Sequence, residues 1–122
     1  MTRTGQFFSR PFASITVDIA KIRDYCLSDT HPRWRHKARV FRSRLGLTVN
    51  DAELLRQALL HAARDSSRDL RPTVRDDYGQ RYVLDVTMTT AVGTGTIRSS
   101  WIVPRGQTAL RLTSCYLLPE TS

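Results

Sequence analysis

The spacing of apolar residues changes from a helical period to a strict alternation near residue 80, and this change constrains the fold most. Segments 81–88, 97–103 and 110–117 alternate apolar and polar residues, the period of a β-strand with one buried face. Short turns at Gly93-Thr94-Gly95 and Pro104-Arg105-Gly106 separate them. We therefore expect an α+β domain, with N-terminal helices packed on one face of a C-terminal antiparallel meander of three to four strands.

Helical patterns precede the alternating segments. A short helix is expected after Asp18, and a basic helix over about residues 31–46, ended by Gly46. The start of the basic helix can be capped by Ser28, Asp29 or Thr30. A further helix is expected over 51–64, opened by the capping box Asn50-x-x-Glu53. Its apolar face consists of Leu54, Leu55, Ala58, Leu59 and Ala62.

Two segments lack a clear period. Residues 1–17 are assigned to an N-terminal tail or arm, which leaves residues 18–122 as a single α+β domain. The charged segment from Asp65 to Asp77 contains Pro72 and is expected to be a flexible loop.

The basic helix has an unusual charge distribution. Between His31 and Asn50 there is no acidic residue, and the basic residues are Arg33, Arg35, Lys37, Arg39, Arg42 and Arg44. At about 100° per residue, one narrow apolar stripe forms from Trp34, Ala38, Phe41 and Leu45. The basic side chains lie on both sides of this stripe, so the helix brings positive charge next to whatever the stripe packs on. This pattern indicates contact with a polyanion.

The overall charge supports the same class of partner. The formal net charge is +8, and the cations other than Lys21 and Lys37 are all arginines. Arginine binds phosphate through a planar fork and stacks on bases, which favours RNA or DNA, although codon usage in a GC-rich genome explains the bias equally well. Two isolated cysteines, Cys26 and Cys115, suit a reduced cytoplasmic protein. Neither a secretory segment nor an apolar run of membrane-spanning length is present, and we expect no membrane partner.

The alternation places a polar set on the second face of the sheet. Its members are Arg81, Asp85, Arg98, Ser100, Arg111 and Thr113. Arginines among hydroxyls and one carboxylate could clamp a phosphate and stabilise charge that builds on it. The alternative is a solvated face on which Asp85 pairs with an arginine of the neighbouring strand.

Lys37 is the sharpest single candidate because it lies at the shoulder of the apolar stripe. A partly desolvated lysine there can stabilise a phosphorane or act as a base, or else extend its stem along the edge of the core. His36 can exchange protons near neutral pH but points away from the stripe, whereas His31 is expected at the helix entrance and His61 at a surface or core edge. No cluster has metal-ligand spacing, so neither a metal nor another cofactor is expected.

Several pieces of residues 20–118 resemble an uncharacterised bacterial toxin-like domain family, of the toxin–antitoxin or polymorphic-toxin type. They are His31-Pro32, Lys37-Ala38 with Phe41, Leu45-Gly46, Tyr78-Gly79, Arg98-Ser99-x-Trp101 and Arg111-Leu112-x-Ser114-x-Tyr116. Trp34 stands where that pattern has a small residue. In outline the family is similar to the barnase–EndoU–colicin–RelE group of metal-independent ribonucleases.

The resemblance implies an endoribonuclease in which the RNA 2′-hydroxyl attacks the adjacent phosphate. It implies phosphate stabilisation by Lys37 and Arg98 with support from Arg111, and His36 as acid or base. Ser100 or Thr113 would orient the RNA, which the arginines of the basic helix (Arg33, Arg35, Arg39, Arg42 and Arg44) would bind. An acidic antitoxin or immunity protein is the implied partner. Two alternatives remain: a nucleic-acid-binding module without catalysis, and a basic protein that docks an acidic partner.

Overall fold

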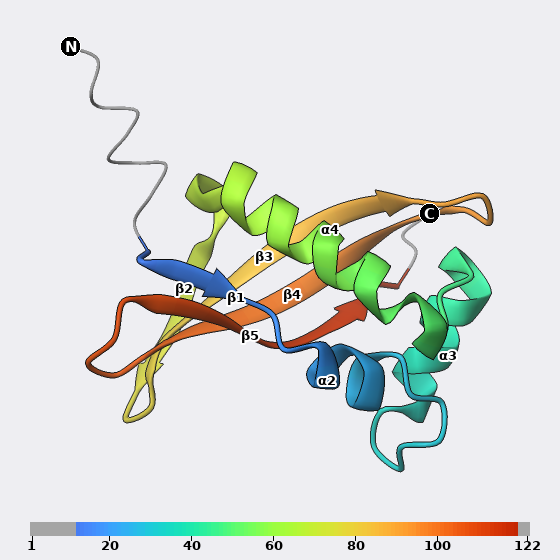
Figure 1. The fold of residues 1–122 in the computed structure, drawn as a ribbon, viewed down its shortest axis with the longest axis horizontal. Helices are drawn as coiled ribbons and strands as arrows, with labels where there is room; N and C mark the ends of the chain where they lie inside the picture. Colours follow the sequence, from blue (N-terminus) through green and yellow to red (C-terminus); the bar gives the residue numbers. More distant parts are fainter. Residues whose placement is uncertain (1–11, 120–122) are drawn as a thin grey trace.

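The computed structural model of the chain describes residues 12–119, and it confirms the α+β class. Short 3-10 turns at Val49–Asp51 and Ser67–Asp69 flank the longest helix. The other elements, in chain order, are β1 (Ser14–Thr16), α2 (Ile19–Lys21), a π-helical turn (Ile22–Cys26), α3 (Arg35–Leu45), α4 (Ala52–Asp65), β2 (Arg71–Asp76), β3 (Gly79–Thr89), β4 (Thr94–Pro104) and β5 (Ala109–Leu117) (Figure 1).

Within residues 12–119 the strands form one sheet in the order β1-β5-β4-β3-β2. The expected meander is the antiparallel run from β2 to β5, and β1 adds a parallel edge strand beside β5. This strand belongs to the segment assigned to the N-terminal arm, of which residues 1–11 lie outside the described part. The expectation of a loop from Asp65 to Asp77 was wrong for β2, whose pairing with β3 tolerates Pro72 because β2 is an edge strand.

The helices begin and end where local side chains satisfy the backbone. Asp18 caps α2 by accepting a hydrogen bond from the backbone N of Ala20 (2.9 Å), as predicted. Gly46 ends α3 with a φ of 71°, also as predicted. At the start of α3 the acceptor is His31 Nδ1, which receives hydrogen bonds from the backbone N of Arg33 and Trp34, in place of the expected Ser28, Asp29 or Thr30.

The entrance to α4 differs from the prediction in the same way. The capping box is formed by Thr48 and Asp51, two residues upstream of the predicted Asn50 and Glu53 pair. This box opens a short 3-10 turn that precedes α4, and the buried residues of α4 are Ala52, Leu55, Leu59, Leu60 and Ala63. Leu54, which was expected on the apolar face, is 54% exposed.

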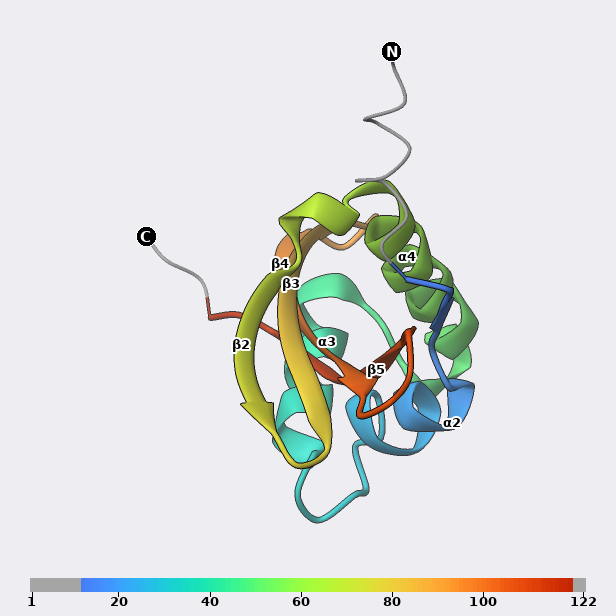
Figure 2. The ribbon, with the colours of Figure 1, turned by 90° about the vertical axis from the view of Figure 1, so that its left-hand side faces the viewer.

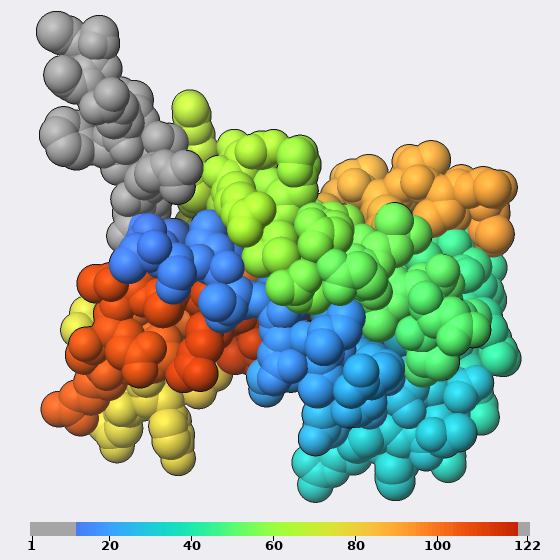
Figure 3. Space-filling model, viewed as in Figure 1, coloured from blue at the N-terminus to red at the C-terminus, as the bar shows by residue number. Residues whose placement is uncertain are grey.

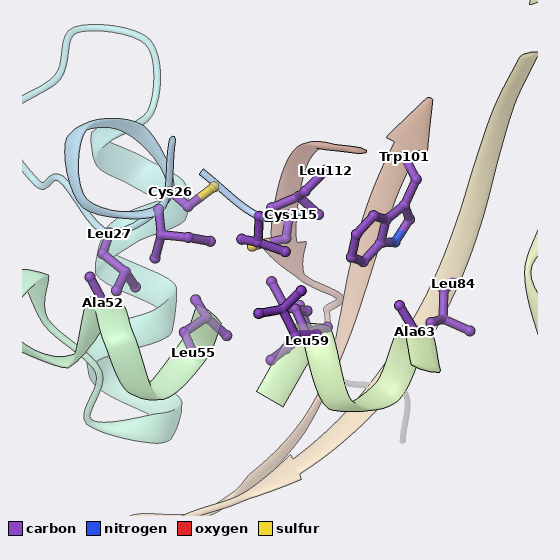
Figure 4. Packing of buried hydrophobic residues seen from close by; sticks show 14 of the residues in the cluster. Cys26, Leu27, Ala52, Leu55, Leu59, Ala63, Leu84, Trp101, Leu112 and Cys115 are labelled. Atoms are coloured by element: carbon purple, nitrogen blue, oxygen red, sulfur yellow. The ribbon is translucent and has the colours of Figure 1, made fainter. Parts of the chain in front are cut away.

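One continuous core lies between the sheet and the helices. Figure 4 shows Leu55, Leu59 and Ala63 of α4 facing Leu112, Cys115, Trp101 and Leu84 of the strands, with Cys26 and Leu27 alongside. In Figure 2, α4 lies against one side of the curved sheet, and it contacts both β3 and β1. The predicted stripe of α3 is confirmed for Ala38, Phe41 and Leu45, which are buried, the last two in this core, whereas Trp34 is half-buried and precedes the helix. Burying a side chain such as Phe41 contributes about 2–3 kcal/mol.

Candidate phosphate-binding face of the sheet

The second face of the sheet carries the polar set expected from the alternation. Register places Asp85 of β3 opposite Arg98 of β4, and Val83 opposite Ser100. On the other side of β4, Arg98 lies opposite Tyr116 and Ser100 opposite Ser114 of β5. None of these residues is buried, whereas the neighbouring Ile97, Ser99 and Trp101 point into the core. We call this surface the open face.

Arg98 is held by a two-pronged ion pair at the centre of the open face. Its Nε and Nη2 donate hydrogen bonds of 2.9 Å to the two carboxylate oxygens of Asp85, and Nη2 of Arg71 lies 3.9 Å from the same carboxylate. The hydrogen bond from Arg98 and the positive charges of Arg98 and Arg71 lower the pKa of Asp85. Asp85, and to a smaller extent Tyr116, raise the pKa of Arg98. The guanidinium is therefore a fixed cation, which interacts with both the carboxylate of Asp85 and the side chain of Tyr116.

Lys37 approaches the open face from α3. Its Nζ lies 4.6 Å from the ring centre of Trp34 and 4.6 Å from the ring centre of Tyr116, so the ammonium sits between two aromatic rings. Within residues 12–119 no carboxylate pairs with it. Two aromatic faces orient this cation without neutralising it, which leaves its charge available to an anion.

Tyr116 reaches the open face because β5 contains one extra residue. The register of β4 and β5 shifts between Ser100 and Trp101, which leaves Thr113 without a partner residue across the ladder. The shift reverses the phase of the end of β5, so that Cys115 and Leu117 enter the core and Ser114 and Tyr116 leave it. An unbroken alternation through 110–117 would place Ser114 and Tyr116 on the core face with Leu110 and Leu112, and that expectation was wrong for this reason. As a result, the ring of Tyr116 lies on the open face, where Lys37 contacts it and Arg98 stands opposite it on β4.

The other expected residues of the sheet lie further along it. Ser100 is two residues from Arg98 on the same face, and Thr113 Oγ1 donates to the backbone O of Ser100 (3.1 Å). Arg111 lies opposite Ile102, which is about 13 Å along β4 from Arg98 at about 3.3 Å per residue. Arg81 is paired with Asp76 (2.9 Å), whose pKa this contact lowers. The structure thus brings Lys37, Arg98 and Ser100 together, and it sets Arg111 apart.

The histidines occupy three different environments. His36 is exposed on α3, and its side chain makes no hydrogen bond or ion pair within residues 12–119. His31 lies at the entrance of α3, as predicted, and also packs against the ring of Tyr25 at a centroid distance of 5.0 Å. His61 is exposed and its Nε2 lies 2.8 Å from a carboxylate oxygen of Asp65.

The arginines of the basic helix divide into two groups. Arg42 pairs with Asp29 (3.2 Å), and Arg44 Nη1 donates to the backbone O of Leu118 (2.6 Å), so both help to hold α3 in place. The side chains of Arg33, Arg35 and Arg39 are exposed and without a partner in the part of the chain that the structure describes. Among the described residues, these three are the unpaired arginines of the segment 31–46.

The chain belongs to a family described as a domain of unknown function, DUF6883, whose sequence profile matches residues 11–119. Among solved structures, the fold is similar to a chain of the contact-dependent growth inhibition toxin–immunity protein complex from Klebsiella pneumoniae 342. The TM-score is 0.64 at 21% sequence identity, and the match covers 84% of this chain and 98% of that chain. No match was found among curated proteins. In residues 12–119, no helix has the length and apolar character needed to cross a bilayer.

Proposed function

With membership of this family as the premise, we propose that the chain is a toxin-like, metal-independent endoribonuclease that acts on RNA in the cytoplasm. The observation that supports the proposal is the arrangement around Tyr116. A lysine ammonium without a carboxylate partner lies against the tyrosine ring, and Arg98 stands opposite the same tyrosine on the neighbouring strand. Two cations that both adjoin Tyr116 suit a phosphate that gains negative charge during reaction.

The reaction that fits these groups is internal transfer at phosphorus. The RNA 2′-oxygen forms a bond to the adjacent phosphorus, and the bond from phosphorus to the 5′-oxygen of the next nucleotide breaks. A 2′,3′-cyclic phosphate and a free 5′-hydroxyl result. Lys37 and Arg98 stabilise the charge on the non-bridging oxygens, and Ser100 orients the strand beside Arg98.

Two proton transfers accompany this step. The 2′-hydroxyl gives its proton to a base, and the leaving 5′-oxygen takes one from an acid. His36 directly precedes Lys37 on α3 and is exposed, so an RNA strand that passes over the first turn of the helix reaches its imidazole. We assign one of these two proton transfers to His36, as acid or base, and the other to solvent water. RNA contacts outside the reacting phosphate are assigned to Arg33, Arg35 and Arg39.

A partner protein belongs to the same proposal. The solved structure with a similar fold is a toxin–immunity protein complex, and this chain has a net charge of +8. An acidic immunity or antitoxin protein would neutralise the free arginines of α3 and cover the phosphate position at once. The alternative, a protein that only docks such a partner, rests on the same exposed Arg33, Arg35 and Arg39.

The test is cleavage of total RNA and of tRNA in EDTA by the purified parent, Lys37→Ala and Arg98→Ala. The matched control is Arg64→Ala, which removes an exposed arginine of α4 that has no partner within residues 12–119. A further variant, Arg98→Lys, keeps the positive charge but loses the two parallel hydrogen bonds to Asp85. Circular dichroism verifies that each variant is folded. We expect the parent and Arg64→Ala to produce 2′,3′-cyclic phosphate ends, and either alanine variant of the site to lose about 100-fold in rate.

Each other outcome assigns a different function. Equal activity of a Lys37→Ala, Arg98→Ala double variant and the parent contradicts the proposed site. Intact RNA with salt-dependent binding indicates a nucleic-acid-binding module without catalysis. Weak RNA affinity together with a tight complex of equal stoichiometry with an acidic protein indicates the docking role.

A further inference from the structure

A cationic pocket that includes Arg111 lies at the junction of β1, α2 and β5, apart from the site around Tyr116. It has a volume of about 240 Å³ and is lined by Lys21 and Arg111, the hydroxyl residues Thr16 and Thr113, and also Asp18, Ile102 and Leu112. Figure 3 shows the hollow between the strand β5 in red and the α2 segment in blue. Pairing explains how it forms, because Thr16 of β1 stands beside Arg111 and Ile102 lies opposite Arg111.

The charges of this pocket are unsatisfied. Lys21 and Arg111 are exposed, and neither side chain has an ion-pair partner within residues 12–119. The carboxylate of Asp18 is engaged as the cap of α2, where it accepts from the backbone N of Ala20. Thr113 Oγ1 donates to the backbone O of Ser100 and keeps its lone pairs. Two cations against one engaged carboxylate favour an anion.

The pocket continues the open face rather than forming a separate surface. Arg98 and Ile102 have the same parity on β4, so both side chains lie on the open face, with Ser100 between them. Ser114 and Tyr116 accompany them on β5. The resulting path is about 13 Å long, with Arg98 at one end, Arg111 and Ile102 at the other, and small hydroxyl side chains between the two ends.

We infer that the Lys21–Arg111 pocket is a second phosphate subsite, and that the open face binds an unpaired RNA strand lying along β4 and β5. The inference rests on the proposed function, since it identifies the substrate of that site as single-stranded. Unpaired bases can splay and contact half-buried aromatic and apolar side chains such as Tyr116 and Ile102, which paired bases cannot do. One phosphate lies between Lys37 and Arg98, and a phosphate a short distance along the strand lies between Lys21 and Arg111.

The test measures binding to a strand that cannot be cleaved, so that it does not depend on catalysis. Affinities of a fluorescent 2′-O-methyl decanucleotide, its duplex and a 2′-O-methyl dinucleotide are compared at several salt concentrations. For the Lys21→Ala, Arg111→Ala variant we expect the decanucleotide to bind roughly tenfold more weakly at low salt. The slope of log K against log salt becomes shallower by about 0.7, because the one phosphate held between Lys21 and Arg111 is no longer neutralised. The dinucleotide, too short to reach the pocket, and the duplex show no such change.

Two further variants keep the inference falsifiable. Asp18→Asn retains a good helix cap but removes the negative charge from the pocket, so it binds the decanucleotide more tightly than the parent. Arg64→Ala, Arg68→Ala removes two exposed arginines at and just after the end of α4 and matches the loss of two charges, with the slope expected to stay within about 0.3 of the parent value.

The outcomes also separate this inference from the proposed function. Cleavage by the parent with an unchanged decanucleotide slope in Lys21→Ala, Arg111→Ala overturns the subsite and leaves the nuclease standing. Absence of cleavage with the expected change in slope overturns the nuclease and leaves the subsite standing. Equal effects on duplex and single strand, or a parent that binds neither, overturn the inference.

Discussion

The ammonium of Lys37 lies 4.6 Å from the ring centre of Tyr116, which joins the basic helix to the open face of the sheet. The two residues are far apart in the sequence, and their contact depends on two independent features. Lys37 lies at the edge of a buried helical stripe, and Tyr116 follows a one-residue irregularity in β5. The buried residues of α3 fix the position of the helix relative to the strands, and the contact follows from that position.

Replacement of Tyr116 separates the contribution of its ring from that of its hydroxyl. Tyr116→Phe retains the aromatic face and should cleave RNA within about twofold of the parent. Tyr116→Ala releases the ammonium from one of its two rings and should lower kcat/KM roughly fivefold, which corresponds to a cation–π interaction of about 1 kcal/mol. The measurement is kcat/KM on one oligoribonucleotide. A phenylalanine variant as slow as the alanine variant would assign the role to the hydroxyl.

The ion pair of Asp85 and Arg98 should make stability depend on pH. Arg98 and Arg71 lower the pKa of Asp85 below its unfolded value of about 3.9, so the pair stabilises the fold fully above about pH 4. This stabilisation is lost as the pH falls through the folded-state pKa. Asp85→Asn should cost on the order of 1 kcal/mol at pH 7 and much less at pH 2.5.

Urea unfolding of the parent and of Asp85→Asn at both pH values measures this difference. Asp65→Asn is the control, because within residues 12–119 the ion-pair partner of Asp65 is the exposed His61, and the side chains of Asp65 and His61 are 63% and 80% exposed. It should change stability by less than about 0.5 kcal/mol at pH 7. A deficit of Asp85→Asn that is the same at pH 7 and pH 2.5 would show that the pair does not titrate as described.

The parts of the fold that follow from a repeating pattern could be predicted from the sequence. The apolar stripe of α3 and the alternation of β3 and β4 each bury one side of their element. Because several residues in succession follow the same period, the pattern indicates the element and its buried side. Lys37 and Arg98 were selected from these patterns, and the structure brings both to the ring of Tyr116. Gly46 was found because few other residues adopt a positive φ at a helix end.

The parts that depend on single-residue events could not be predicted. An extra residue in β5 reverses which side chains are buried, and no composition marks it, because Thr113, Ser114 and Cys115 suit either face. The cap of α4 shifted because Thr48 and Asp51 satisfy the same rule as Asn50 and Glu53. Strands β1 and β2 pair through their backbones at the two edges of the sheet, where side-chain alternation is weak.

Ser99 should be the most costly polar residue of the core to remove. It is fully buried, its Oγ donates to the backbone O of Leu84 (2.6 Å), and it accepts from Trp101 Nε1 (2.8 Å). Ser99→Ala leaves both partners unsatisfied and should cost about 1–3 kcal/mol in the free energy of unfolding. Ser114→Ala, at a half-buried serine of the open face, should change it by less than about 0.5 kcal/mol.

A double-mutant cycle measures how much of the cost of Ser99→Ala comes from the lost hydrogen bond with the indole of Trp101. Trp101→Phe removes the N–H that Ser99 accepts, so Ser99→Ala should cost less in that background than in the parent. Urea unfolding of the four proteins gives the coupling energy. Strictly additive costs would show that the hydrogen bond from Trp101 contributes nothing to stability.

Substitution of Gly46 is restricted both by its positive φ and by the nearby side chain of Val92, and comparison with Gly106 separates these two effects. Its φ is 71°, and a Cβ added there would lie 2.6 Å from Cγ2 of Val92, whereas Gly106 has a φ of 77° with nothing within 4 Å of such a Cβ. Gly106→Ala should therefore cost only the backbone strain, about 1 kcal/mol. Gly46→Ala should cost more, because the side chain of Val92 must also move. Adding Val92→Ala should return the cost to that of Gly106→Ala, as measured by urea unfolding; a double variant no more stable than Gly46→Ala would place the whole cost in the backbone.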